Sequence, residues 1–206
     1  MIKAIIFDFG SVIYKTKWKE LDEFFSKKNG FSVLIANSND DELIRIYRDS
    51  DVGKEDFRKF FLRINPNVAD INKVLEDYKE GYSKYKILNG ELLKIIKDLR
   101  KRGFRLFGFT DIKKEHYEAN LKLGVYDGFE EIFTSFEFNH LKSEKKSFDR
   151  LAKELKRYGL NPSECVFVDD RLENVENARK IGMKAIHYAE FPDVGLFKAK
   201  LEEVLS

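Results

Sequence analysis

The sequence has 206 residues, of which 43% are hydrophobic and 36% charged, a composition that excludes an intrinsically disordered chain and an integral membrane protein. Basic and acidic residues number 38 and 36 and are finely mixed, so the chain offers no positive surface for nucleic acid or for an anionic membrane. We expect one folded core with room for a modest inserted domain. We also expect a cytoplasmic protein, because no apolar run is long enough for a membrane span and none reads as a signal peptide.

Strand-like and helix-like segments alternate over most of the chain. Residues 2–7 are apolar and rich in β-branched side chains, which predicts a strand buried on both faces. Four further strands are expected at 104–109, 131–134, 165–168 and 184–187. Apolar residues at helical spacing predict helices at 90–102, 112–123, 144–158 and 172–181. The alternation predicts an α/β fold with a doubly wound, three-layer parallel sheet.

The segment from residue 15 to residue 87 breaks this alternation. Apolar periodicity there predicts only helices and no strand. The expected helices lie at 18–28, 41–49, 54–63 and 68–85. We therefore expect a core domain formed by residues 1–14 and 88–206, with residues 15–87 forming a helical cap domain over the strand tips.

Carboxylates occur at the ends of two predicted strands, at the edge where a doubly wound sheet binds its ligands. Asp8 follows the first strand, and Asp169 and Asp170 follow the fourth. Three neighbouring carboxylates repel one another, and a hard divalent cation such as Mg²⁺ relieves that repulsion. An acidic residue at a strand end is usually a turn former. Two adjacent acids after a buried strand, however, gain nothing structurally without a partner.

Groups suited to an anion follow the other strands. The Thr110 hydroxyl and the Lys142 ammonium would complement a bound anion, and such a set beside a metal suits phosphoryl transfer. Each residue also has a plainer interpretation. Thr110 would be a surface hydroxyl, Lys142 one of 38 basic residues, and Asp111 the N-cap of the following helix. Spacing alone leaves both a ligand site and an ordinary strand edge open.

The order of these segments resembles the four motifs of the haloacid dehalogenase superfamily. Residues 7–13 (Phe-Asp-Phe-Gly-Ser-Val-Ile) resemble the first motif, and residues 107–110 the second. Lys142 is similar to the lysine of the third, although Ser143 stands where proline is usual. Residues 167–178, with their paired acids, closely resemble the fourth. A helical insertion after the first motif is similar to the cap of subfamily I, which includes many small-metabolite phosphatases.

The resemblance implies a Rossmann-like core and a Mg²⁺-dependent hydrolase, a phosphatase acting on a small phosphorylated metabolite. Asp8 would be the nucleophile and would form an aspartyl-phosphate. The other implied roles are metal binding by Asp8, the Gly10 carbonyl, Asp169 and Asp170, phosphate binding by Thr110, Lys142 and the Asp111 backbone N–H, and support of the site by Asn174. The expected partner is a small molecule, with no nucleic acid or membrane, and the chain would be a monomer or a homodimer.

Gly10 departs from the superfamily pattern, which usually has at that position a second Asp that protonates the leaving group and activates water. Loss of such assistance slows a reaction by about 10²–10⁴-fold. Two alternatives follow from it. One is a haloacid dehalogenase-type hydrolase, since those relatives also lack the second Asp, although Asp169 and Asp170 argue against it. The other is a catalytically weak module that binds phosphorylated ligands.

The loop at 14–19 would help to choose the substrate in a capped enzyme. Its residues Lys15, Lys17 and Trp18 could contact an anionic or ring-shaped substrate. The plainer expectation is that the lysines are solvated and that Trp18 packs against the cap.

Overall fold

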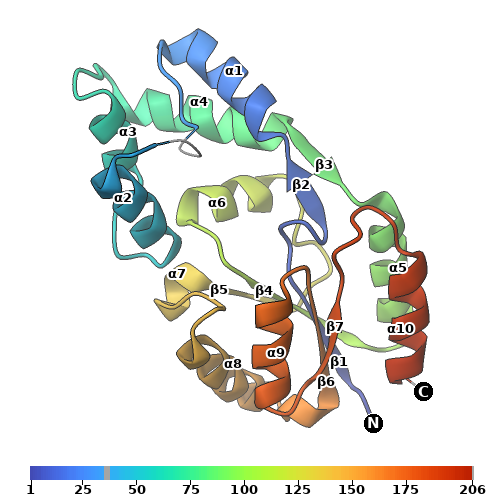
Figure 1. The fold of residues 1–206 in the computed structure, drawn as a ribbon. Helices are drawn as coiled ribbons and strands as arrows, with labels where there is room; N and C mark the ends of the chain where they lie inside the picture. Colours follow the sequence, from blue (N-terminus) through green and yellow to red (C-terminus); the bar gives the residue numbers. More distant parts are fainter. Residues whose placement is uncertain (35–37, 206) are drawn as a thin grey trace.

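The structure, a computed structural model, describes residues 1–34 and 38–205. Its centre is a five-stranded parallel sheet in the order β5-β4-β1-β6-β7 (Figure 1). The strands are β1 Ala4–Phe7, β4 Arg105–Thr110, β5 Glu131–Thr134, β6 Cys165–Asp169 and β7 Lys184–His187. Each predicted strand is confirmed to within a residue or two, and with them the α/β fold class.

Helices flank this sheet on both sides (Figure 1). They are α5 Gly90–Lys101, α6 Lys114–Lys122, α7 Ser135–Phe138, α8 Lys145–Arg157, α9 Leu172–Lys180 and α10 Gly195–Leu205, with a 3₁₀ turn at Pro162–Glu164. The predicted helices correspond to α5, α6, α8 and α9. Helices α7 and α10 are additional to them.

Two buried clusters lie on opposite faces of the sheet, because successive side chains of a strand point to opposite sides. Ile5 and Phe7 of β1 belong to one cluster, with side chains of α5 and α10. Ala4 and Ile6 belong to the other, with side chains of α8 and α9. All four β1 side chains are fully buried, as expected for a strand covered on both faces.

The inserted segment folds into four helices that lie together at the top and left of Figure 1. They are α1 Trp18–Asn29, α2 Asp41–Asp51, α3 Arg58–Ile64 and α4 Ile71–Lys84. Asp40 and Asp70 cap α2 and α4 by accepting backbone N–H groups of the first turn, as good N-cap residues do. The helices enclose a buried cluster of their own, rich in Phe and Tyr, which Ala119 of α6 joins.

The prediction that residues 15–87 contain no strand is wrong at both ends of the segment. Strands β2 Tyr14–Thr16 and β3 Lys86–Leu88 form a two-stranded antiparallel ribbon where the chain enters and leaves the helical insertion. Each strand has only three residues, too few to show alternation. Their stability comes from pairing with each other across the whole insertion. Among the described residues, no helix combines the length and apolar composition needed to cross a membrane.

Candidate active site

Asp8 follows the central strand of the sheet and is held by the neighbouring strand. Its backbone N–H donates to the carbonyl of Val168 in β6 at 2.8 Å, so the sheet register extends to this residue. Strand β1 lies between β4 and β6, and parallel strands end at the same edge of a sheet. The fold therefore brings Asp8 beside Thr110 and Asp169, the last residues of β4 and β6. All three side chains are buried.

Lys142 joins two of the predicted carboxylates. Its ammonium donates to Asp8 Oδ1 at 2.5 Å and to Asp169 Oδ2 at 2.6 Å. The loop that carries it is fixed on both sides. The Lys142 backbone N–H donates to Asp111 Oδ1 at 2.9 Å, and its carbonyl accepts from Asn177 Nδ2 at 3.2 Å. These contacts explain how a lysine can be almost wholly buried, because a buried charge requires a close partner.

Asp169 is the most firmly held of the acids. Asn174 Nδ2 donates to its two carboxylate oxygens at 3.0 and 3.2 Å, and the Arg171 backbone N–H donates to Oδ1 at 2.9 Å. Asp170 is half-buried, and its carbonyl lies 2.8 Å from His187 Nε2 in β7. The structure thus places Asn174 directly behind the acidic pair, where it orients Asp169.

Carboxyl groups outnumber cations at this site. The pKa of Asp8 is raised to about 8, mainly by burial and also by the charges of Asp169 and Asp170, against the lowering effect of Lys142. Burial also raises the pKa of Asp170 and of Asp111. Burial opposes the charge of Lys142, but attraction to Asp169 and Asp8 exceeds that effect and raises its pKa. One ammonium among four carboxyl groups leaves negative charge uncompensated.

A divalent cation fits this deficit. Asp8, Asp169 and Asp170 each offer a carboxylate oxygen, and these three oxygens lie within 4.8 Å of one another. Mg²⁺ binds oxygen at roughly 2.0–2.1 Å, so its opposite ligands lie roughly 4 Å apart. The donor set is made of hard oxygens and carries the charge that the ion would neutralise. The structure therefore brings the three predicted carboxylate ligands together, with Gly10 on the loop just beyond Asp8.

The expectation that Asp111 caps the helix after β4 is wrong. Lys113 occupies the N-cap position of α6 and makes no capping bond with its side chain. The Asp111 carboxylate instead accepts the backbone N–H of Lys142, and so it ties the loop of the third motif to the end of β4. Its partner lies far along the chain, so no local pattern could have indicated it.

Gly10 stands beside open space. A Cβ added at this residue would meet no atom within 4 Å. Its backbone does not adopt a left-handed conformation, whereas that of Ser11 does, with φ 60°. A side chain at position 10 would therefore begin in open space and without backbone strain. The fold therefore does not force glycine on this position.

A chamber of about 390 Å³ opens beside Gly10, between the core and the helical insertion. We call it the aromatic chamber, because the rings of five residues contribute to its walls. It is lined by Gly10, Ser11, Tyr14, Lys15, Thr16, Trp18, Tyr47, Asp51, Tyr82, Asp111, Ile112, Lys113 and His116.

The loop residues singled out from the sequence divide between two roles. Trp18 packs against Tyr82 of α4, with ring centroids 6.0 Å apart, but it is still 42% exposed and lines the aromatic chamber. Lys15 also lines the chamber and is exposed. Lys17 is exposed, 3.8 Å from Glu20, and does not belong to the lining.

Sequence reasoning missed an ion pair that joins the insertion to the core. Lys113, 1% exposed, donates to Asp51 Oδ1 of α2 at 2.5 Å. Ser135 supports the same contact, since its hydroxyl donates to the Asp51 carbonyl and accepts the Ile112 backbone N–H. Lys113 lies only three residues after Thr110, and this nearness to a predicted site residue is a weak indication of its role. Asp51 lies in a stretch of mixed charge, so nothing in the neighbouring sequence indicates that it pairs with Lys113.

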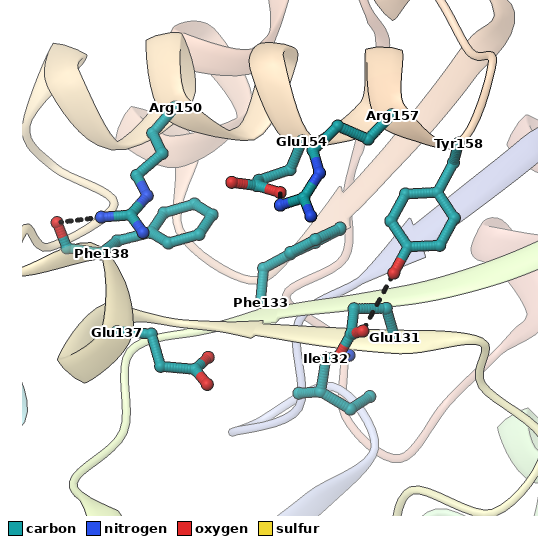
Figure 2. Close-up of a pocket in the computed structure, with 9 residues that line it drawn as sticks. All are labelled: Glu131, Ile132, Phe133, Glu137, Phe138, Arg150, Glu154, Arg157 and Tyr158. Atoms are coloured by element: carbon teal, nitrogen blue, oxygen red, sulfur yellow. Dashed lines mark hydrogen bonds and ion pairs between the residues drawn. The ribbon is translucent and has the colours of Figure 1, made fainter.

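A larger cavity, of about 550 Å³, lies on a different part of the molecule, between β5, α7 and α8 (Figure 2). None of the predicted site residues lines it. Several of its charged groups already have partners: Tyr158 donates to Glu131, Arg157 to Glu154, and Arg150 to the Phe138 carbonyl. Asp8, Asp169 and Asp170 are not part of its lining.

The carboxyl edge of a parallel α/β sheet is where such a fold binds its ligands, and here it carries acids and a lysine suited to a cation and an anion. The sequence model of the haloacid dehalogenase-like hydrolases matches residues 2–182. The chain belongs to this family, and the resemblance noted from its motifs is confirmed at that level.

Individual proteins are similar to this chain in sequence or in fold. The chain is 26% identical over 200 residues to a glyceraldehyde 3-phosphate phosphatase of Methanopyrus kandleri, covering 90% of this chain and 83% of the relative. It is 24% identical over 202 residues to an enolase-phosphatase E1 of Aquifex aeolicus, covering 90% and 89%. A Bacteroides thetaiotaomicron family enzyme, solved with magnesium and inorganic phosphate, has a TM-score of 0.75 at 18% identity, covering 96% of this chain and 99% of its own.

Proposed function

We propose that the protein is a Mg²⁺-dependent phosphatase that hydrolyses a small phosphorylated metabolite through an aspartyl-phosphate on Asp8. The observation that carries this proposal is the contact between Lys142 and both Asp8 and Asp169 at 2.5 and 2.6 Å, at the edge of the sheet where the acids converge. A carboxylate held in this way is oriented for attack, and the Lys142 ammonium lowers its pKa against the effect of burial.

The reaction divides into two displacements on phosphorus. A carboxylate oxygen of Asp8 forms a bond to phosphorus while the bond to the leaving oxygen breaks, and water then displaces phosphate from Asp8. Lys142 offsets the charge of Asp8 and of the phosphoryl group, and the Thr110 hydroxyl donates to a phosphoryl oxygen. Asp8, the Gly10 carbonyl, Asp169 and Asp170 would hold Mg²⁺, which supplies charge neutralisation when bound. Asn174 keeps Asp169 in position for this task.

The relatives support the choice of phosphoryl chemistry. Two of them are named phosphatases, and a structural neighbour is described as a complex with magnesium and inorganic phosphate. A further neighbour, a HAD phosphatase from Thermococcus onnurineus, has a TM-score of 0.66 at 23% identity over 100% of this chain and 98% of its own.

The helical insertion acts in this proposal as the cap of a subfamily I enzyme, with residues 1–14 and 88–206 as the core domain and 15–87 as the cap domain. Strands β2 and β3 pair at the point where the two meet, which suits a hinge. The Lys113–Asp51 pair would hold the cap over the strand tips. Glycine in place of the second Asp of the first motif is the variant feature of this chain.

Two other functions compete with the phosphatase. A haloacid dehalogenase would share the absence of an acid at Gly10 but would not need three clustered carboxylates, which repel one another without a cation. A weak phospho-ligand-binding module would keep the cation site and lack turnover. The acidic cluster favours the phosphatase and the binding module, which both use a cation, over the dehalogenase.

One experiment separates these functions. The purified protein is assayed with an aryl phosphate and with a haloacid, each with and without Mg²⁺. We expect Mg²⁺-dependent release of phosphate from the aryl ester and no halide release. Asp8→Asn should lower phosphate release by at least about 10⁴-fold, as loss of a nucleophile does, whereas Asp149→Asn, on an exposed residue of α8, should not. Halide release without metal would establish the dehalogenase. Phosphate binding without turnover would establish the binding module.

A further inference from the structure

We infer that the aromatic chamber receives a planar aromatic leaving group that has no charged substituents, so that the substrate class is an aryl phosphate ester. The inference rests on the proposed phosphatase function and specifies its substrate. It differs from the three-carbon alkyl phosphate in the name of the Methanopyrus kandleri relative.

The position of the chamber suits the leaving group. Gly10 and Asp111 lie in its wall; Gly10 is two residues beyond Asp8, and Asp111 directly follows Thr110. A phosphoryl group at Asp8 would therefore have its ester oxygen directed toward the chamber. The volume of about 390 Å³ falls in the range of roughly 300–1,000 Å³ that is usual for pockets holding ring-sized ligands.

The walls of the chamber are flat rings held in fixed positions. His116 and Tyr82 stack with centroids 3.9 Å apart and planes only 2° from parallel. Trp18 lies 6.0 Å from each of them and leaves much of its own ring exposed. Tyr14 and Tyr47 also belong to the lining. Tyr82 and His116 are buried, so Trp18 offers the exposed face on which a ligand ring can stack. A ring that is already packed on one side loses little freedom when a ligand ring stacks on the other.

The buried lysine and the histidine of the chamber lining offer no free positive charge for a second anionic group. Lys113 is neutralised by Asp51 at 2.5 Å and lies 3.7 Å from the centre of the Tyr47 ring. His116 Nε2 lies 2.9 Å from the Tyr78 hydroxyl, and burial lowers the pKa of His116 well below its ordinary value, so that its ring is neutral. Lys15, the other lysine of the lining, is exposed, where solvent and salt screen its charge.

The chemistry of the leaving group points to the same class independently. Without an acid at position 10, the P–O bond must break with little protonation of the departing oxygen. A phenolate has a conjugate acid of pKa about 10, whereas water, comparable to an alkyl alcohol, has a pKa of about 15.7. The phenolate keeps the electron pair of the broken bond and takes its proton from solvent. An aryl ester therefore tolerates Gly10 far better than an alkyl ester.

The single tryptophan of the chain provides a direct test that does not depend on turnover. Phenylphosphonate and methylphosphonate, which are not hydrolysed, are titrated into the full-length protein with Mg²⁺ while Trp18 fluorescence is followed. We expect phenylphosphonate to change the Trp18 emission and to bind at least about tenfold tighter than methylphosphonate, as stacking on a preformed aromatic wall allows.

Variants assign that preference to the chamber. By calorimetry, Trp18→Ala should reduce the difference between the two phosphonates to about twofold, while Trp18→Phe should retain most of it. Tyr158→Leu, in the distant cavity of Figure 2, should leave both affinities unchanged. Equal affinities, or an emission that ignores phenylphosphonate, would overturn the inference even if the protein hydrolyses phosphate esters. Tight phenylphosphonate binding without hydrolysis of any ester would overturn the proposed function and leave the chamber assignment standing.

Discussion

Two buried lysines show how differently the two halves of the molecule are built. Lys142 binds two acids of the core, Asp8 and Asp169, at the edge of a sheet whose strands are buried on both faces. Lys113 binds one acid, Asp51, which belongs to the helical insertion, and its ammonium lies over an aromatic ring. Burial opposes the charge of each lysine, and neighbouring negative groups raise the pKa of both.

The surroundings of the two lysines differ in the same way. Around Lys142 the contacts are short, charged and directed at two carboxylates, so they fix atoms that react. Around Lys113 the rings Tyr47 and Phe57 and the neighbouring stack of Tyr82 and His116 provide shape with little net charge. In the function that we propose, reaction chemistry belongs to the sheet edge and recognition belongs to the aromatic chamber.

Gly10→Asp tests whether the sheet edge lacks only a proton-transfer group. In the native protein, attack by Asp8 on an aryl phosphate should be fast, and hydrolysis of the aspartyl-phosphate should be slow without a general base. We expect a burst of phenolate followed by slow turnover in rapid-quench measurements. Because Gly10 faces open space, Gly10→Asp should fold normally and raise the slow rate by about 10²-fold, the lower end of general acid–base assistance.

Gly10→Asn is the matched control, because it adds a side chain of the same shape that transfers no proton. It should leave the burst and the slow rate as they are. Steady turnover without a burst in the native protein, with alkyl phosphates cleaved as fast as aryl ones, would mean that another residue supplies the proton transfers.

Asp170→Ala tests the charge deficit of the same edge. At a Mg²⁺ concentration 100-fold above its dissociation constant, binding should raise the free energy of unfolding by about 2.7 kcal/mol, measured by urea denaturation with and without the metal. Asp170→Ala should lose most of this gain. Without Mg²⁺ the variant should be at least as stable as the native protein, because the charge of Asp170 repels Asp8. Asp149→Ala is the control, and a native protein that ignores Mg²⁺ would refute the metal assignment.

The sheet edge could be predicted from the sequence because its determinants are local. An apolar, β-branched run predicts each buried strand, and the polar residue that ends the run lies at the edge of the sheet where ligands bind. The strand order β4-β1-β6 then brings Asp8, Thr110 and Asp169 together. Lys142 follows another predicted strand, and the resemblance to known motifs distinguished it from the other basic residues, because its position in a loop carries no periodicity.

The remaining features depend on contacts between distant segments. Strands β2 and β3 exist only because Tyr14 and Thr16 pair with Leu88 and Lys86, and three residues carry no strand pattern of their own. The Asp111 carboxylate was assigned to the helix beside it, but a backbone N–H on another loop is its partner. The chamber likewise combines Trp18 with rings from other helices, so its shape follows from packing that a linear pattern does not encode.

Lys86 tests the aromatic side of the comparison. Its ammonium lies 3.8 and 3.7 Å from the ring centres of Tyr14 and Tyr82 and donates to Asn120 Oδ1 at 2.6 Å. Burial lowers the pKa of Lys86 to about 7, whereas an unfolded lysine has a pKa of about 10.4. Between these pH values the unfolded chain binds more protons than the folded one, so Lys86 makes the folded state more stable as pH rises, by at most about 1.4 kcal/mol per pH unit.

Lys86→Met should therefore flatten the pH dependence of stability between about pH 7 and 10. Urea denaturation of the native protein and the variant at several pH values gives the difference, in which the many other titrating groups cancel. Lys84→Met, on an exposed lysine of α4, is the control and should retain the native slope. Parallel curves for the native protein and Lys86→Met would mean that the attraction of the two tyrosine rings for the ammonium offsets the effect of burial and keeps Lys86 charged. The rings at this junction would then hold a cation as firmly as the carboxylates hold Lys142, and the division between a charged sheet edge and a neutral aromatic region would fail there.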